Sequence, residues 1–249
     1  ELTLALYGLA AEAAYLNGDF EQMEKLAEVV LQQAKIPLDK VKGYEVKIQA
    51  YTVQNKLLEA IKIALEALKL LGVKLPPDPN QGDMWLGRVR TKLTLAKIRV
   101  EELINLPEMT NPYMLAAMRI IASVCTATYF IAPQLWQMMV FQKIQLSLKY
   151  GNAPGSPFGY ADYAMVLCGV EGDIDTGYQF AQLALNLLPR LNAKEFKSKT
   201  FLLVEMYVRH WKEHLRETLN PLLDAYQSGL EAGDLEYGVF SIFYRSYHS

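Results

Sequence analysis

The stretch Gly151–Pro189, GNAPGSPFGYADYAMVLCGVEGDIDTGYQFAQLALNLLP, decides the fold. Gly151 is suited to end one helix, because glycine readily adopts the left-handed conformation found after helix ends. Ser156 predicts the cap of the next helix and Pro157 its first position, where no amide hydrogen is needed. This helix is expected to run to about Val170.

A turn at Gly172 then joins this helix to a second one. Asp173 or Asp175 can accept the unpaired amides at its start, and the helix is expected to stop at Pro189. Three small residues on the second helix would allow a neighbouring helix to lie close: Gly177, Ala181 and Ala184. The stretch therefore predicts one antiparallel helical hairpin.

The composition favours helices throughout and excludes several classes of function. Of the 249 residues 51% are apolar, and prolines and glycines fall in clusters separated by intervals that are long for strands. A net charge of -2 argues against a nucleic-acid partner. Cys125 and Cys168 stand far apart in apolar sequence without metal-ligand spacing, so we interpret both as core residues.

The spacing of small residues after the hairpin turn recurs elsewhere, which predicts a helical repeat. Turns at Gly18, Asn55 and Gly172 are followed at equal spacings by three sets of residues: Met23, Ala27 and Val30; Ala60, Ala64 and Ala67; and Gly177, Ala181 and Ala184. Gly233 begins a degraded fourth copy.

These units resemble the tetratricopeptide repeat (TPR). The residues that match the family are the turn Gly18-Asp19-Phe20, the first-helix aromatics Tyr7 and Tyr44, Tyr51 before a turn, and the small residues Ala60, Ala67, Gly177 and Ala184. The resemblance implies an all-α fold, a TPR-like right-handed superhelix of stacked antiparallel helical hairpins with about twelve helices.

We expect TPR-like hairpins over residues 1–72, a proline-rich linker over 73–84, and the same array continuing over 85–249. Within the first part, the helix Leu57–Leu71 carries one narrow charged stripe: Glu59, Lys62, Glu66 and Lys69. After the linker, Trp85–Leu106 has the periodicity of one amphipathic helix. Its basic residues form either a solvated face or a surface for an acidic partner: Arg88, Arg90, Lys92, Lys97 and Arg99.

The run Ile120–Gln142 carries no charge and is long enough to cross a bilayer. Pro133 divides it, however, so we expect two buried helices, Pro112–Ile131 and Pro133–Tyr150, and no membrane span. Further on, Asn192 with Glu195 predicts a capping box, and the helix after it is expected to reach about Trp211.

Two readings stay open near the carboxyl end. Either a helix starts at Pro221 with Asn220 as its cap, or a helix begun near Lys212 is kinked there. Asp234 can cap the last helix. Its aromatic residues are expected to share one face against which the next unit of a longer protein would pack: Tyr237, Phe240, Tyr244 and Tyr247.

No catalytic, cofactor-binding or metal-binding residue is expected. The segment Gly172–Gly177 has the glycine spacing of a phosphate loop, but the required lysine is missing. His210 and His214 are one helical turn apart, yet no third ligand accompanies them.

Residues 155–192 and 210–238 resemble the helical region of large cyanobacterial-type signalling proteins, which carry a serine/threonine kinase domain, a P-loop ATPase and a sensor histidine kinase. This resemblance implies a non-catalytic, cytoplasmic scaffold and protein-interaction region. Its partners would be neighbouring domains of the same polypeptide or signalling proteins, linking ATPase and kinase modules to the output kinase. The alternative is a free-standing TPR-type peptide-binding adaptor, whose groove would expose Asn, Lys and Arg from successive first helices.

Overall fold

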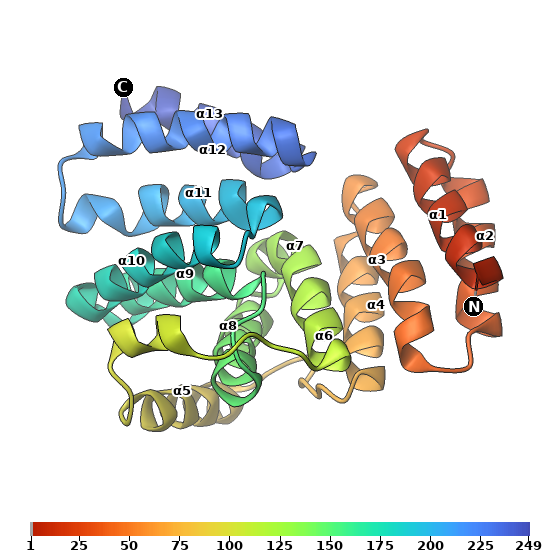
Figure 1. The fold of residues 1–249 in the computed structure, drawn as a ribbon, viewed down its shortest axis with the longest axis horizontal. Coiled ribbons are helices and arrows are strands. Elements are labelled where there is room, and N and C mark those ends of the chain that lie inside the picture. Colours follow the sequence, from red (N-terminus) through yellow and green to blue (C-terminus); the bar gives the residue numbers. More distant parts are fainter. Residues whose placement is uncertain (1) are drawn as a thin grey trace. The chain divides into compact units, whose positions relative to one another are not determined.

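The computed structural model describes residues 2–249, and within this range every regular element is a helix (Figure 1). The α-helices are α1 Leu2–Leu16, α2 Phe20–Gln33, α3 Pro37–Val53, α4 Leu57–Leu70, α5 Gln81–Leu95, α6 Pro112–Ser123, α7 Cys125–Ile131, α8 Pro133–Tyr150, α9 Ser156–Val166, α10 Ile174–Arg190, α11 Lys197–Tyr207, α12 Leu219–Ala232 and α13 Leu235–His248. Successive helices pack as pairs, among them α1 with α2, α3 with α4, α9 with α10 and α12 with α13. The all-α prediction is confirmed.

The chain divides into two compact units that are interleaved in sequence. Unit 1 holds the described residues up to Leu86 together with Thr110–Met139. Unit 2 holds Gly87–Met109 together with Val140–Ser249. The division therefore falls inside α5 and again inside α8.

Unit 1 begins with a pair of helices joined by the expected glycine turn. Gly18 has φ +75, and the Asp19 carboxylate accepts a hydrogen bond from the Gln22 amide at 3.0 Å, which caps α2. Where α2 packs against its neighbours the buried residues are mostly small: Ala11, Met23, Ala27, Val46 and Ala50. Small residues let the helix axes approach closely, so the repeat spacing in the sequence marks helix contacts.

Most of the uncharged run is buried, and its residues up to Met139 belong to unit 1, but Phe130, Ile131, Pro133 and Gln134 are exposed. The first helix of the run is also broken. The expected helix Pro112–Ile131 divides at Val124 into α6 and α7. The Thr128 hydroxyl donates to the carbonyls of Val124 and Cys125, and such side-chain bonds to the backbone favour bends. Over residues 2–249 no single helix combines the length and apolarity of a membrane span, although α6 and α7 together meet that test as a pair bent by 48°.

The predicted hairpin forms within unit 2, with corrections to both helices. Helix α9 begins at Ser156, so Pro157 is its second residue and not its first, and it is α-helical only to Val166 and not to about Val170. Gly151 has φ +97 after α8, and the Asp173 carboxylate caps α10 by accepting from the Thr176 amide at 3.2 Å. Ser156 is not the cap of α9, because Gly155 holds that position and the Ser156 hydroxyl instead accepts from the Ala153 amide at 2.9 Å. Helix α10 also continues one residue past the predicted stop, to Arg190.

The predicted helix Trp85–Leu106 is wrong at both ends. Asn80 and Asp83 form a reciprocal cap, in which the Asn80 side chain accepts from the Asp83 amide and the Asp83 carboxylate accepts from the Asn80 amide. This cap starts α5 at Gln81, within the segment expected to be a linker, and α5 ends at Leu95. Residues 96–99 form a turn, and Val100–Asn105 forms a 3₁₀ helix. Tertiary contacts hold this segment, since the Leu103 carbonyl accepts from the buried Asn152 side chain at 2.8 Å.

The structure decides between the alternatives near Pro221. A new helix starts near Pro221: α12 begins at Leu219, so Pro221 lies in its first turn. The N-cap position is held by Thr218 and not by Asn220. Helix α11 ends at Tyr207, short of Trp211. Asn192 does not form the predicted capping box, since it adopts φ +49 directly after α10 and α11 starts only at Lys197.

Candidate interaction surfaces

A π-helical turn, Leu167–Glu171, ends the first helix of the hairpin and places one carboxylate in a nearly buried position. The Gly172 amide donates to the Leu167 carbonyl, and Gly172 itself has φ +71. The Glu171 side chain is only 4% exposed. Arg88 Nε lies 3.3 Å from one of its oxygens and Lys92 Nζ lies 2.5 Å from the other. Because Arg88 and Lys92 are four residues apart on α5, both reach the same carboxylate.

The basic residues predicted as a partner surface therefore fall into two groups, those paired with acidic residues of this chain and those exposed without such a partner in the part of the chain that the structure describes. Arg88 and Lys92 bind the chain's own Glu171. Arg99 Nη2 lies 2.6 Å from Glu102 Oε1 on the surface, and Arg90 and Lys97 are exposed. Sequence reasoning missed Glu171, since nothing in the turn indicates that a π-helical turn would direct this side chain toward α5.

The predicted aromatic face of α13 points mainly inward. Tyr237 is 8% exposed, and its ring lies edge-on to Phe158 at a centroid distance of 5.9 Å. Lys199 Nζ lies 4.9 Å from the centre of the same ring. Phe240 and Tyr244 are half-buried, and only Tyr247, 78% exposed, reaches far into solvent.

A different face of α13 is apolar and exposed. Its residues recur at every fourth position: Leu235, Val239, Phe243 and Tyr247. In unit 1, helix α1 exposes a comparable set: Leu2, Leu6, Leu9 and Leu16. Of these residues, only Tyr247 was predicted from the sequence to lie on a candidate surface. Their spacing was a usable signal, but the aromatic residues of α13 suggest two faces and the sequence cannot tell which of them is buried.

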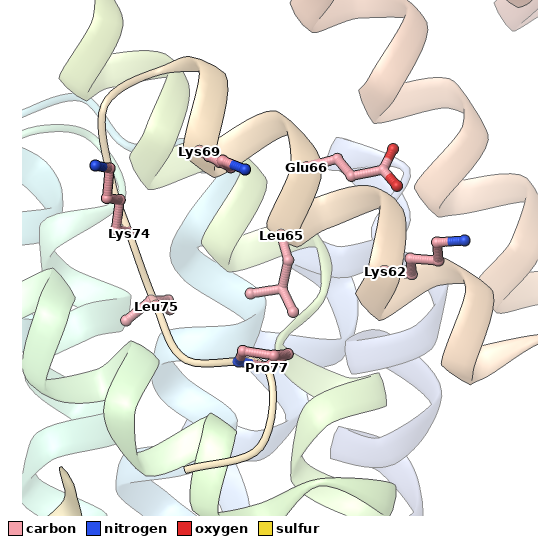
Figure 2. A pocket seen from close by; sticks show the side chains of 7 residues that line it. All are labelled: Lys62, Leu65, Glu66, Lys69, Lys74, Leu75 and Pro77. Atoms are coloured by element: carbon pink, nitrogen blue, oxygen red, sulfur yellow. The ribbon is translucent and has the colours of Figure 1, made fainter.

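Helix α4 and the segment after it line an open hollow of about 490 Å³ in unit 1 (Figure 2). It is lined by Lys62, Leu65, Glu66, Lys69, Lys74, Leu75 and Pro77. The sequence marked Lys62, Glu66 and Lys69 as a charged stripe. That the segment after Gly72 runs back along α4 was not foreseen.

The beginning of the hairpin in unit 2 holds a buried polar network. Lys143 Nζ donates to the Asp162 carboxylate, with both side chains almost fully buried, and also lies 4.3 Å from the centre of the Phe158 ring. Nearby, the Tyr160 hydroxyl donates to the Asn152 side chain at 2.9 Å, and burial raises the Tyr160 pKa. These groups satisfy one another inside the core, so they stabilise the hairpin and offer no surface.

A second buried acid lies on α11. Glu205 is fully buried, and Arg209 Nε lies 3.1 Å from one of its oxygens without hydrogen-bond alignment. Burial raises the pKa of Glu205 to about 8, although the positive charge of Arg209 opposes the rise. The Tyr178 hydroxyl donates to Glu213, which also faces Arg209.

The histidines and cysteines considered as possible metal ligands or reactive groups make contacts that stabilise the fold. His214 accepts from the Arg216 amide at 3.2 Å, and the His210 ring packs against Trp211. Across residues 2–249 no group of three or more His, Cys, Asp or Glu side chains is arranged to hold a metal ion. Cys125 and Cys168 are buried thiols, and burial raises the pKa of Cys168 to about 11, which suppresses the reactive thiolate.

Neither a protein-family profile nor a solved structure matches the chain. A hybrid signal transduction histidine kinase, designated G, from Dictyostelium discoideum is similar over 253 residues at 19% identity. The match covers 94% of this chain but spans 7% of the length of that protein. This all-helical chain thus has a distant similarity to one short part of a much longer signalling kinase.

Proposed function

We propose that this chain is a non-catalytic helical scaffold in a signalling protein of the histidine-kinase type, joining ATPase and kinase modules to the output kinase. The observation that carries the proposal is the pair of exposed apolar faces, one on α1 in unit 1 and one on α13 in unit 2. Such faces are expected where helices pack against further protein. The similarity to one short part of a long hybrid kinase supports the same context.

The alternative, a peptide-binding adaptor, is less well supported. An adaptor groove would present unpaired cations from the first helix of each pair, but two of the three lysines of α3, Lys42 and Lys47, are paired within unit 1. Lys42 Nζ lies 2.6 Å from Glu12, and Lys47 Nζ lies 2.6 Å from Glu24. These contacts hold α3 against α1 and α2 and leave little charge for a ligand.

The scaffold's partners would be neighbouring domains of the same polypeptide or separate signalling proteins, and it would work in the cytoplasm beside those modules. The exposed residues Arg90 and Lys97 and the α13 face are the candidate contacts. Arg88 and Lys92 are weaker candidates because a partner carboxylate would have to compete with Glu171.

The test is limited proteolysis with mass spectrometry on the native protein that contains this chain, with and without ATP. The double variant Val239→Lys/Phe243→Lys removes the apolar character of the α13 face, and Gln227→Lys/Glu231→Lys changes exposed residues of α12 as a control. We expect protection of α13 to change with nucleotide in the native protein and to be lost only in the first variant. If protection of α13 is the same with and without ATP, and the same in both variants, the scaffold role is refuted.

A further inference from the structure

The hollow beside α4 has two walls of different character (Figure 2). One wall is α4 itself, which contributes Lys62, Leu65, Glu66 and Lys69. The other is the extended segment that follows, represented by Lys74, Leu75 and Pro77. Because Pro76, Pro77 and Pro79 have no amide hydrogens, this second wall cannot pair with a ligand as a strand edge would. The proline carbonyls can still accept hydrogen bonds, but most donors for an acidic ligand must come from side chains.

The side chains form an apolar floor with a basic rim. Leu65, Leu75 and Pro77 provide the floor, and in Figure 2 Leu65 points toward Pro77. The three rim lysines are exposed: Lys62, Lys69 and Lys74. Within residues 2–249 none of these three lysines makes a hydrogen bond or an ion pair, in contrast to Lys42 and Lys47 of α3. With three lysines and Glu66, the rim thus carries a net positive charge over an apolar surface.

Glu66 makes the charge along the α4 side of the rim alternate in sign. It lies between Lys62 and Lys69 on α4, and those two lysines are separated by two helical turns, about 10 Å along the axis. A continuous acidic run would bring a carboxylate against Glu66. Carboxylates placed on both sides of one apolar residue would avoid it. An extended peptide covers about 10 Å with three residues and about 13 Å with four, so carboxylates three to four residues apart match the two lysines.

We propose that this hollow binds a short acidic peptide segment with one apolar anchor. The anchor would lie on Leu65, Leu75 and Pro77, and flanking aspartate or glutamate side chains would pair with the rim lysines. A protein segment fits better than a nucleic acid, because the floor is apolar and Glu66 would repel a polyphosphate chain. The proposal is independent of the scaffold role, which depends on the α1 and α13 faces.

The test is fluorescence anisotropy with the 249-residue chain and a fluorescein-labelled peptide, SDSLSDS. The variant Lys69→Glu/Lys74→Glu should bind this peptide about tenfold more weakly, the effect of losing two exposed charge pairs. The control Lys35→Glu/Lys194→Glu makes the same change of net charge at exposed lysines outside the hollow and should stay within about twofold of the original chain. Thermal unfolding followed by circular dichroism checks that each variant is folded.

Two altered peptides test the two halves of the site. Replacing leucine by alanine should weaken binding by removing the anchor, and replacing both aspartates by lysines should abolish it. Equal binding of the aspartate and lysine peptides, or equal losses in the two protein variants, would overturn the proposal. It would also be overturned if the peptide failed to bind while vesicles with 25% phosphatidylserine retained the original chain but not Lys69→Glu/Lys74→Glu, since the hollow would then face a membrane.

Discussion

Replacing Gly151 by alanine should destabilise unit 2 more than any other glycine substitution in a turn of the same kind. Gly151 has φ +97, and a Cβ built on it would lie 2.2 Å from the Pro107 carbonyl oxygen. That oxygen accepts from the Asn152 amide at 2.8 Å, and the Met109 amide donates to the Asn152 carbonyl at 2.8 Å. The carbonyl is therefore held in place by the bonds that join this loop to the hairpin.

The cost has two parts. An alanine at positive φ costs about 1 kcal/mol. Relieving the overlap requires either strain or the loss of the two backbone hydrogen bonds, which adds about 2 kcal/mol. Gly172→Ala is the matched control, because Gly172 also has positive φ, at +71, but no atom lies within 4 Å of its added Cβ. It should cost only the first part, about 1 kcal/mol.

Urea unfolding followed by circular dichroism at 222 nm gives the two free energies, and thermal unfolding gives an independent check. For a chain of this length the midpoint should fall by roughly 6–12 °C in Gly151→Ala and by roughly 2–4 °C in Gly172→Ala. Equal losses of unfolding free energy in the two variants would refute the reasoning, because the Pro107 carbonyl would then move away from the added Cβ without an energetic penalty.

Other substitutions test the buried charges. Between the ordinary pKa of 4.5 and about 8, folded Glu205 keeps a proton that the unfolded chain releases, so stability should fall as pH rises through this window. Glu205→Gln should flatten the dependence of the urea midpoint on pH, and an unchanged slope would contradict the raised pKa. Lys143→Met leaves the Asp162 carboxylate buried without its ammonium partner and should cost about 3–5 kcal/mol of unfolding free energy, whereas a loss below 1 kcal/mol would mean that solvent reaches the pair. Glu171→Gln should cost about 1 kcal/mol, because its partners Arg88 and Lys92 are more than a third exposed, and should speed amide exchange in α5; unchanged exchange would mean that the pair does not hold that helix.

Turn chemistry made much of the fold predictable. Gly18, Gly151, Gly172 and Asp173 each specify a helix end through backbone conformation or a side-chain cap, and these local rules hold without knowledge of the rest of the molecule. The failures occur where periodicity continues but the helix does not. After Leu95 the apolar spacing persists, yet the chain turns and then forms a 3₁₀ helix, which a hydrogen bond from a distant residue holds.

The candidate surfaces were less predictable for a related reason. The basic residues of α5 were visible in the sequence, but their pairing with Glu171 depends on how a π-helical turn is placed against α5. On α13, apolar residues occupy nearly the whole circumference, so only packing distinguishes the buried Tyr237 from the exposed Phe243. The hollow depends on the return of the proline-rich segment along α4, a tertiary arrangement that local patterns do not encode.

The interleaving of the two units has a consequence for synthesis on the ribosome. The chain passes from one unit to the other after Leu86, after Met109 and after Met139. The first unit cannot be completed until residue 139 has emerged from the exit tunnel, and by then residues 87–109 have already been made without the partners that later bury Leu103 and pair with Glu108. At ordinary elongation rates, roughly 5–20 residues per second, this early segment waits several seconds for Asn152 to be synthesised, and until then it lacks the hydrogen bond that Asn152 gives to Leu103.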